Sequence, residues 1–134
     1  MRFMLIRRAD KNTETGAMPS SELLTAMMNY NQEMAEAGVF LDGVGLRPSS
    51  HGARVKITSD KPIVTDGPFA ETKELIAGFT LIQVNSREEA IAWVKRWPVL
   101  DAPVEIEIRQ LFELEDFGPE AINRRPEPGT SEPR

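Results

Sequence analysis

The sequence contains no cysteine and only one histidine, His51, among its 134 residues. Without cysteine the chain has no disulfide, no thiolate nucleophile and no cysteine ligand for a metal. One histidine and scattered carboxylates also match no spacing that is typical of a transition-metal site. We therefore expect no metal and no cofactor, and the cytoplasm is the natural location for a chain free of disulfides.

Long apolar runs and an excess of positive charge are missing as well. The apolar run Phe3–Ile6 is too short for a membrane span or a signal peptide, and two arginines end it. The net charge is −5, so no basic surface favours nucleic acid. Gly43 and Gly45 lack the third glycine and the following helix of a dinucleotide site. The sequence thus predicts neither a membrane protein nor direct nucleic-acid binding.

Apolar residues make up 40% of the chain, which is enough for one core and favours a single domain. They alternate or run together in segments that we interpret as strands: Phe3–Ile6, Val39–Leu41, Ala53–Ile57, Ile63–Thr65, Phe79–Val84 and Val104–Ile108. The alternation within Ala53–Ile57 predicts a half-buried strand, and the segments Arg8–Pro19 and Arg47–Gly52 are interpreted as polar loops.

Helical spacing appears in two further segments, Leu23–Met34 and Ala90–Trp97. Ser20 or Ser21 caps the first helix, and Ser86 with Glu89 forms a capping box for the second. Both tryptophans of the second helix, at positions 93 and 97, lie on one face and are expected in the core.

The order of these elements predicts an α+β fold. Ser59–Pro62 forms the turn of a β-hairpin, and without that hairpin the order is the ferredoxin-like βαββαβ, an antiparallel sheet with two helices on one face. The strands Phe3–Ile6 and Phe79–Val84 are apolar on both faces, so the open face of the sheet needs a second layer. A second copy of the chain is the simplest supplier, and we expect a homodimer. After Leu114 the chain becomes rich in Pro, Glu and Arg, which predicts a domain over residues 1–115 and a flexible tail over residues 116–134.

The segment from Val64 to Glu74 is the most informative part of the chain. Gly67 can take φ > 0 or let another backbone come close, and Pro68 fixes its own φ and offers no N–H. Asp66 can accept hydrogen bonds from the amides just ahead of it, as Asx residues do at turns. These residues predict a stiff loop that presents one carboxylate at a strand end, and a rigid turn without chemistry is the alternative.

The segment Asp66–Phe69, followed by Ala70–Glu74 and Gly78-Phe79, resembles the signature of the DGPF family within the YCII-related proteins. Gly45–Pro48 upstream, and Ser86–Ala90 leading into Trp93, extend the resemblance over roughly residues 1–115. The resemblance implies a dimeric α+β barrel, a fold whose members perform proton-transfer chemistry on cyclic or aromatic compounds. It also implies a transcription-related protein partner, because DGPF-type proteins are companions of extracytoplasmic-function sigma factors.

Asp66 is the candidate catalytic residue, paired with Arg54 or Arg7. Beside an arginine its carboxylate would stay ionised as an anchor or weak base, and buried it could act as a general base. The related proteins carry a proposed His–Asp pair with the histidine near the first strand, where this chain reads Ile6–Asp10 without one, so only Asp66 corresponds. The predicted ligand-binding residues are Arg7, Arg54, Asp66, Gly67, Pro68, Phe69 and Glu74.

Other titratable groups around this segment have two interpretations. His51 is a solvated loop residue or a general base. Glu71, Lys73 and Glu74 line the rim of a pocket or form a solvated charge run. Three functions therefore remain open: a small-molecule pocket near the Asp-Gly-Pro-Phe loop with proton-transfer chemistry, a non-catalytic regulatory or interaction module associated with sigma factors, and a structural dimer with a vestigial pocket.

Overall fold

The structure, a computed structural model, describes residues 1–120, so most of the expected tail over 116–134 lies outside the described residues. Its strands are β1 Arg2–Arg8, β2 Phe40–Gly45, β3 Ala53–Lys56, β4 Ile63–Asp66, β5 Ile76–Gln83 and β6 Ile106–Gln110. Its helices are α1 Lys11–Glu14, α2 Ser21–Glu36 and α3 Arg87–Val94, and its 3-10 turns are η1 Ser49–His51, η2 Thr72–Glu74, η3 Val99–Asp101 and η4 Leu114–Phe117.

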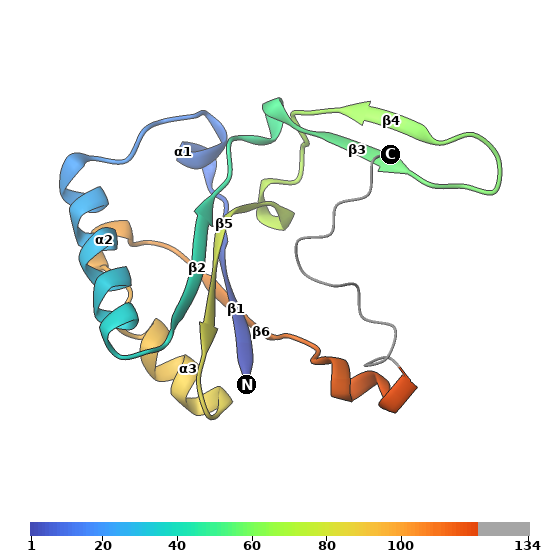
Figure 1. Ribbon diagram of the computed structural model, residues 1–134. Helices are drawn as coiled ribbons and strands as arrows, with labels where there is room; N and C mark the ends of the chain where they lie inside the picture. The colour runs from blue at the N-terminus through green and yellow to red at the C-terminus, as the bar shows by residue number, and fades with distance from the viewer. Residues whose placement is uncertain (121–134) are drawn as a thin grey trace, which may run out of the picture.

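Four strands form one antiparallel sheet in the order β2-β5-β1-β6. Helices α2 and α3 cover one face of this sheet (Figure 1). Without the β3–β4 hairpin, this order and these helices are the ferredoxin-like βαββαβ arrangement, which confirms the predicted α+β fold. None of the helices among residues 1–120 is long and apolar enough to cross a membrane.

The core lies between the sheet and these two helices. Phe3 and Ile82 are cross-strand neighbours, so both side chains point to the helical face, where they are buried with Leu5 and Met34. Tyr30 of α2 lies against Trp93 and Trp97, with ring centroids 6.5 and 5.6 Å apart. The prediction that both tryptophans belong to the core is confirmed.

Tyr30 is buried, and its hydroxyl donates a 2.6 Å hydrogen bond to the Trp93 carbonyl. Burial raises its pKa from 10.0 to about 12. Because the unfolded chain ionises this phenol first, stability should fall as the pH rises from about 10 to about 12, by roughly 3 kcal/mol. Tyr30 is the only tyrosine, so the ultraviolet absorbance of tyrosinate reads its titration directly. A midpoint near 10 in the folded protein would contradict the burial, and Tyr30→Phe should remove this part of the alkaline destabilisation.

The starts of α2 and α3 have the predicted serine caps, but the predicted capping box of α3 is incomplete. The Ser20 hydroxyl accepts a hydrogen bond from the Leu23 N–H, and the Ser86 hydroxyl accepts one from the Glu89 N–H, both at 3.1 Å. The Glu89 carboxylate, however, accepts from the Asn85 N–H at 3.0 Å, so only half of the predicted capping box forms. Both serines still satisfy backbone donors that a helix leaves free at its start.

The expected loop Arg8–Pro19 contains the short helix α1, which the prediction missed. Asp10 and Thr13 form its capping box, because the Asp10 side chain accepts from the Thr13 N–H and the Thr13 hydroxyl accepts from the Asp10 N–H. The Thr13 N–H, helped by the Arg7 guanidinium, lowers the pKa of Asp10 despite some desolvation. A helix of four residues buries no apolar side chain, so it leaves no helical period in the sequence.

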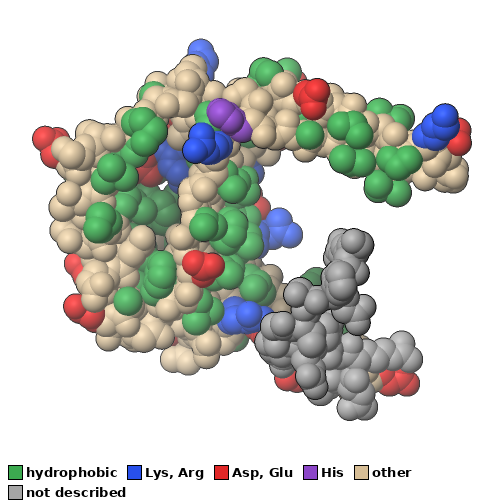
Figure 2. Space-filling view, turned by 45° about the horizontal axis from the view of Figure 1, so that its top comes forward, with side chains coloured by type: hydrophobic (Ala, Val, Ile, Leu, Met, Phe, Trp, Pro, Cys, Tyr) green, Lys and Arg blue, Asp and Glu red, His purple; other side chains and the backbone are tan. Residues whose placement is uncertain are grey.

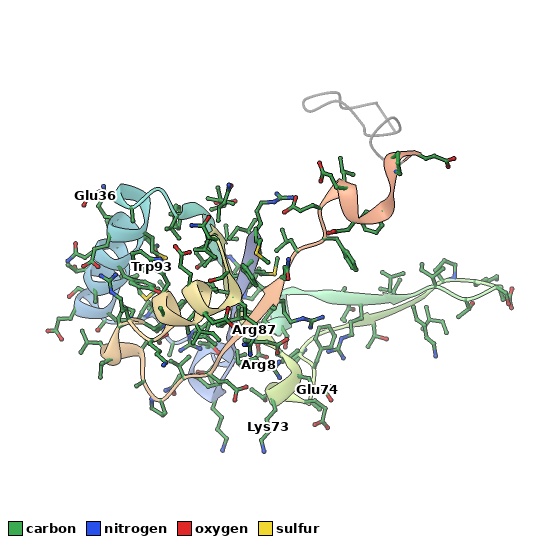
Figure 3. The ribbon with its side chains drawn as sticks, turned by 90° about the horizontal axis from the view of Figure 1, so that it is seen from below. Arg8, Glu36, Lys73, Glu74, Arg87 and Trp93 are labelled. Atoms are coloured by element: carbon green, nitrogen blue, oxygen red, sulfur yellow. The ribbon has the colours of Figure 1, made fainter. Side chains whose placement is uncertain are left out.

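Strands β3 and β4 form a separate two-stranded sheet. This hairpin projects from the side of the main sheet that faces away from α2 and α3 (Figures 1 and 3). The expectation of a half-buried strand over Ala53–Ile57 is wrong for the single chain, in which Val55 is 54% and Ile57 is 77% exposed. The alternation predicts one buried face, but within residues 1–120 both strands of the hairpin are exposed along their whole length.

The open face of the main sheet is apolar at its centre. The pairs Met4↔Leu81 and Ile6↔Phe79 place four half-buried side chains on this face, while their neighbours in sequence point to the helices. Val44 of β2 extends the same surface through its pairing with Phe79. The predicted apolar character of both faces of β1 and β5 is thus confirmed.

Candidate active-site loop

The loop Asp66–Phe69 connects β4 to the turn η2 and is tied to the preceding loop by backbone groups. The Gly67 N–H donates to the Gly52 carbonyl at 3.0 Å, and the Phe69 N–H donates to the Ser49 hydroxyl at 3.1 Å. The Gly67–Pro68 peptide bond between these two contacts is cis. One hydrogen bond on each side of Pro68 gives the stiff loop that the sequence predicts.

Gly67 is required here by a close backbone approach. A Cβ atom built at this position would lie 1.8 Å from the Ser49 carbonyl oxygen and 2.7 Å from its carbonyl carbon. No side chain fits at these distances unless one of the two loops moves. Of the two roles predicted for Gly67, the close backbone approach is confirmed, and Gly67 is not one of the glycines with positive φ.

Ser49 in turn is held by Glu14 at the end of α1. The Glu14 carboxylate accepts from the Ser49 N–H at 3.0 Å and from its hydroxyl at 2.5 Å. A chain of contacts therefore runs from α1 through η1 to the amide of Phe69. Sequence reasoning missed both residues, because they lie 35 positions apart and share no motif.

Arg54 and Asp66 lie on opposite faces of the hairpin. Ala53 pairs with Asp66 and Arg54 pairs with Thr65, so neighbours along the strand alternate between the two faces. The Arg54 guanidinium lies over the Phe69 ring, 3.8 Å from its centroid, which is a cation–π contact. The hypothesis that Arg54 pairs with Asp66 is therefore wrong for the single chain, although both residues lie at the root of the hairpin.

The Asp66 carboxylate is exposed and has no hydrogen bond or ion pair with any other residue among positions 1–120. The expected turn cap does not form, because no amide is left for it. The Gly67 N–H is used by Gly52, Pro68 has no N–H, and the Phe69 N–H is used by Ser49. The loop thus fixes the backbone of Asp66 while leaving its carboxylate free.

Arg7 has carboxylate partners of its own. It binds Asp101 with two hydrogen bonds of 3.0 and 2.7 Å, lies 3.5 Å from Asp10, and donates to the Arg8 carbonyl. The hydrogen bond to Asp101 raises the pKa of Arg7 above its ordinary value, although burial works against this shift. The Trp97 indole N–H also donates to Asp101, at 2.9 Å. The structure therefore brings Arg7 to η3 and not to Asp66.

Glu74 lies on η2, near a surface hollow of about 500 Å³. Arg8 borders this hollow, pairs with Glu107 at 2.9 Å and also donates to the Lys73 carbonyl. Figure 3 shows Lys73 and Glu74 at the outer side of this region. The residues lining the hollow are Arg8, Ala9, Asp10, Lys73, Pro103, Val104 and Glu105, so it is separate from Asp66.

Residues 1–115 match the YCII-related domain. The chain belongs to the YCII-related family. An uncharacterized protein of Rhizobium meliloti (strain 1021) is 38% identical to this YCII-related protein over 64 residues, which are 48% of this chain and about half, 52%, of that protein. A solved structure, 5-chloro-2-hydroxyhydroquinone dehydrochlorinase from Burkholderia phenoliruptrix AC1100 in complex with 2,5-dihydroxybenzoquinone, is similar with a TM-score of 0.46 and 13% identity, covering 84% of this chain and 94% of that one.

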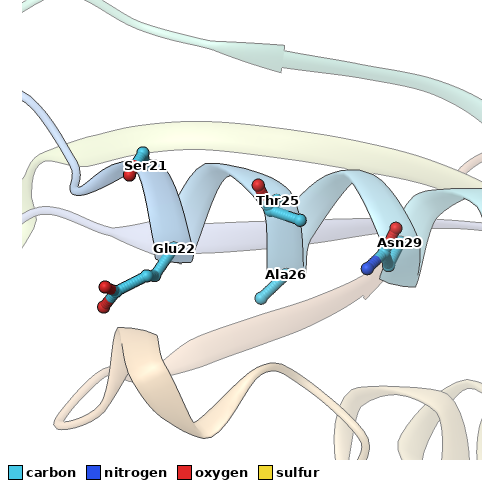
Figure 4. A pocket seen from close by; sticks show the side chains of 5 residues that line it. All are labelled: Ser21, Glu22, Thr25, Ala26 and Asn29. Carbon is cyan, nitrogen blue, oxygen red and sulfur yellow. The ribbon is translucent and has the colours of Figure 1, made fainter.

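His51 of the YCII-related protein lies in η1, the turn that packs against the Asp66–Phe69 loop. Its side chain is exposed and makes no hydrogen bond to the other described residues. A second hollow, of about 360 Å³, runs along α2 and is lined by Ser21, Glu22, Thr25, Ala26 and Asn29 (Figure 4). Among residues 1–120, no three His, Cys, Asp or Glu side chains are grouped closely enough to hold a metal ion.

Proposed function

We propose that this YCII-related protein binds a small cyclic or aromatic molecule beside Asp66, and that the Asp66 carboxylate accepts a proton from it. One observation carries the proposal: the Gly67 and Phe69 N–H groups are used elsewhere and Pro68 has none, so the Asp66 carboxylate has a fixed backbone and no partner among residues 1–120. A residue with only a turn-capping role would use those amides itself. A fixed, unpartnered carboxylate at a strand end suits general-base work.

The stiffness of the loop supports the proposal further. Gly67 and Phe69 are each tied to the neighbouring loop, and Ser49 is tied to Glu14. A group held in place before the ligand arrives loses little conformational freedom on binding. In this proposal Gly67 and Pro68 form the wall of the site, and Arg54 stacked on Phe69 supplies a positive charge at its edge.

The open sheet face would supply the apolar contacts. Met4, Ile6, Phe79 and Leu81 offer the kind of surface on which a planar ring can lie. Glu74 would stand at the rim of the site. Arg7 would have a supporting role, because it fixes the end of β1 against η3, and it would not contact the ligand.

The alternative, a non-catalytic module with a transcription-related protein partner, stays a prediction. The exposed apolar side chains of Val99 and Leu100 on η3 are candidate contacts for such a partner, and Met28 on α2 is a further one. None of these residues belongs to the loop of Asp66.

A thermal-shift screen with phenol, catechol and hydroquinone tests the proposal. A ligand that binds only the folded state raises the melting temperature, and it adds about 2.7 kcal/mol of stability at a concentration about a hundred times its Kd. We expect at least one compound to stabilise the wild type and the Asp60→Asn variant but not Asp66→Asn. Asp60 is the matched control, because it is an exposed carboxylate in the turn of the same hairpin. An equal shift for Asp66→Asn would contradict the proposal.

A further inference from the structure

We propose that the β3–β4 hairpin is an arm that docks on a second copy of this chain, and that docking closes the site around Asp66. The first half of this inference concerns the hairpin alone. The second half rests on the proposed function.

The arm has one apolar face. The pairs Ala53↔Asp66 and Val55↔Val64 share this face, and the alternation continues it to Ile57. Val64 is 64% exposed, and Val55 and Ile57 are exposed as well. A two-stranded ribbon alone is marginally stable in water. This face therefore needs a covering surface, which residues 1–120 of the same chain do not provide.

The direction of the arm is set at its root. The bonds of Gly67 to Gly52 and of Phe69 to Ser49, and the stacking of Arg54 on Phe69, hold the base of the hairpin against η1. From there the arm extends on the open side of the main sheet, away from the helices (Figures 1 and 3). Figure 2 shows the concave space between the arm and the body, with hydrophobic atoms along the arm and on the body beside it.

The length of the arm selects a second copy as the occupant of this space. From Ala53 to the turn at Ser59 the arm measures about 20 Å, at about 3.3 Å per residue. Facing sheets pack about 10 Å apart. Suppose that the apolar open face of one sheet packs against the open face of a second copy. Each arm is then longer than the distance between the two sheets, so it reaches the sheet of the other copy and lies along it. In a two-fold symmetric dimer, both arms and both open sheet faces are covered at the same time.

Charge favours the same partner. The arm carries Arg54, Lys56 and Lys61 against Asp60 and Asp66, so it is positive in a chain whose net charge is −5. The remainder of each copy is therefore acidic and attracts the arm of the other. A nucleic acid or an acidic membrane would meet the same acidic body and be repelled.

Docking has a direct consequence for Asp66. Its side chain lies on the apolar face of the arm, in line with Val55 and Val64. The surface that covers these valines also borders the free carboxylate and screens it from water. The site is thus incomplete in one chain, and the second copy supplies its missing wall.

Sedimentation equilibrium of Val64→Asp tests the arm against a matched control, Ile63→Asp. Both are exposed apolar residues of β4, but Ile63 pairs with Lys56 on the opposite face. We expect the wild type at about 30 kDa, twice the 15.0 kDa of one chain. Val64→Asp should weaken the dimer about thirtyfold or more, as loss of an interface hot spot does. Ile63→Asp should stay within about threefold of the wild type.

Hydrogen exchange of the wild type gives a readout that needs no substitution. Amides of residues 55–64 should exchange more slowly at a high protein concentration than at a low one. A monomer at every concentration, or a dimer that Val64→Asp leaves intact while the arm amides exchange freely, would overturn the inference. The second result leaves the proposed function standing. A confirmed arm with equal ligand binding by Asp66→Asn would overturn the proposed function alone.

Discussion

Replacing Arg7 by alanine should lower the free energy of unfolding by about 3 kcal/mol or more, because a buried carboxylate then loses its positively charged partner. The side chain of Asp101 is only 8% exposed, and that of Arg7 is 16% exposed. Two hydrogen bonds from Arg7 and one from the Trp97 indole satisfy this carboxylate. Without Arg7 the charge of Asp101 keeps only the indole N–H. The contact joins β1 to η3 across 94 residues, so its loss frees the segment that follows α3.

Arg2→Ala is the matched control for this prediction. Arg2 makes the same two-bond contact with Glu113, but these side chains are 42% and 36% exposed. Water replaces an exposed partner, so this substitution should lower the stability far less than Arg7→Ala does. Urea unfolding of both variants measures the difference. Equal losses would show that the Arg7–Asp101 contact is no stronger than a surface ion pair.

Gly67→Ala should be the second large effect, at about 3 kcal/mol, because its methyl group has no space. The new Cβ would lie 1.8 Å from the Ser49 carbonyl oxygen, which is backbone and cannot rotate away. The two loops must separate, and the hydrogen bonds from Gly67 to Gly52 and from Phe69 to Ser49 lengthen or break. Overpacking of this kind typically costs 1–3 kcal/mol, and lost hydrogen bonds add to it.

Gly52→Ala provides the control in the same pair of loops. Its Cβ would meet the Ser49 carbonyl oxygen at 3.5 Å, an ordinary contact, so we expect a change within about 0.5 kcal/mol. Hydrogen exchange at the Phe69 amide should quicken in the Gly67 variant and stay unchanged in the Gly52 variant. Similar stability and exchange for both variants would contradict the close approach at Gly67.

The sequence was sufficient to predict those strands and helices whose apolar residues recur at a regular spacing. The unbroken apolar runs around Leu5 and Ile82 indicated two strands that are apolar on both faces, and Ser20 and Ser86 marked two helix starts. The same periods misjudged the hairpin, since alternation reports that one face is apolar but not what covers it. If a second copy covers it, the alternation was informative about the assembly.

The candidate site was harder to predict, because its contacts depend on register and on distant pairs. That Arg54 and Asp66 lie on opposite faces follows from the pairing of Ala53 with Asp66, which depends on the length of the turn between the strands. The partner of Arg7 is 94 residues away, and that of Glu14 is 35 residues away. No local pattern encodes either pair, whereas Gly67 and Pro68 by themselves indicated either a positive φ or a close backbone approach at Gly67.

Titration calorimetry on three proteins tests the Asp66 site most directly. The wild type, Asp66→Asn and Val64→Asp would each be titrated with the phenol that gives the largest thermal shift. We expect one binding site per chain in the wild type and at least a tenfold weaker affinity for both variants, about 1.4 kcal/mol or more. Wild-type affinity in the Asp66→Asn protein would show that Asp66 does not contact the ligand.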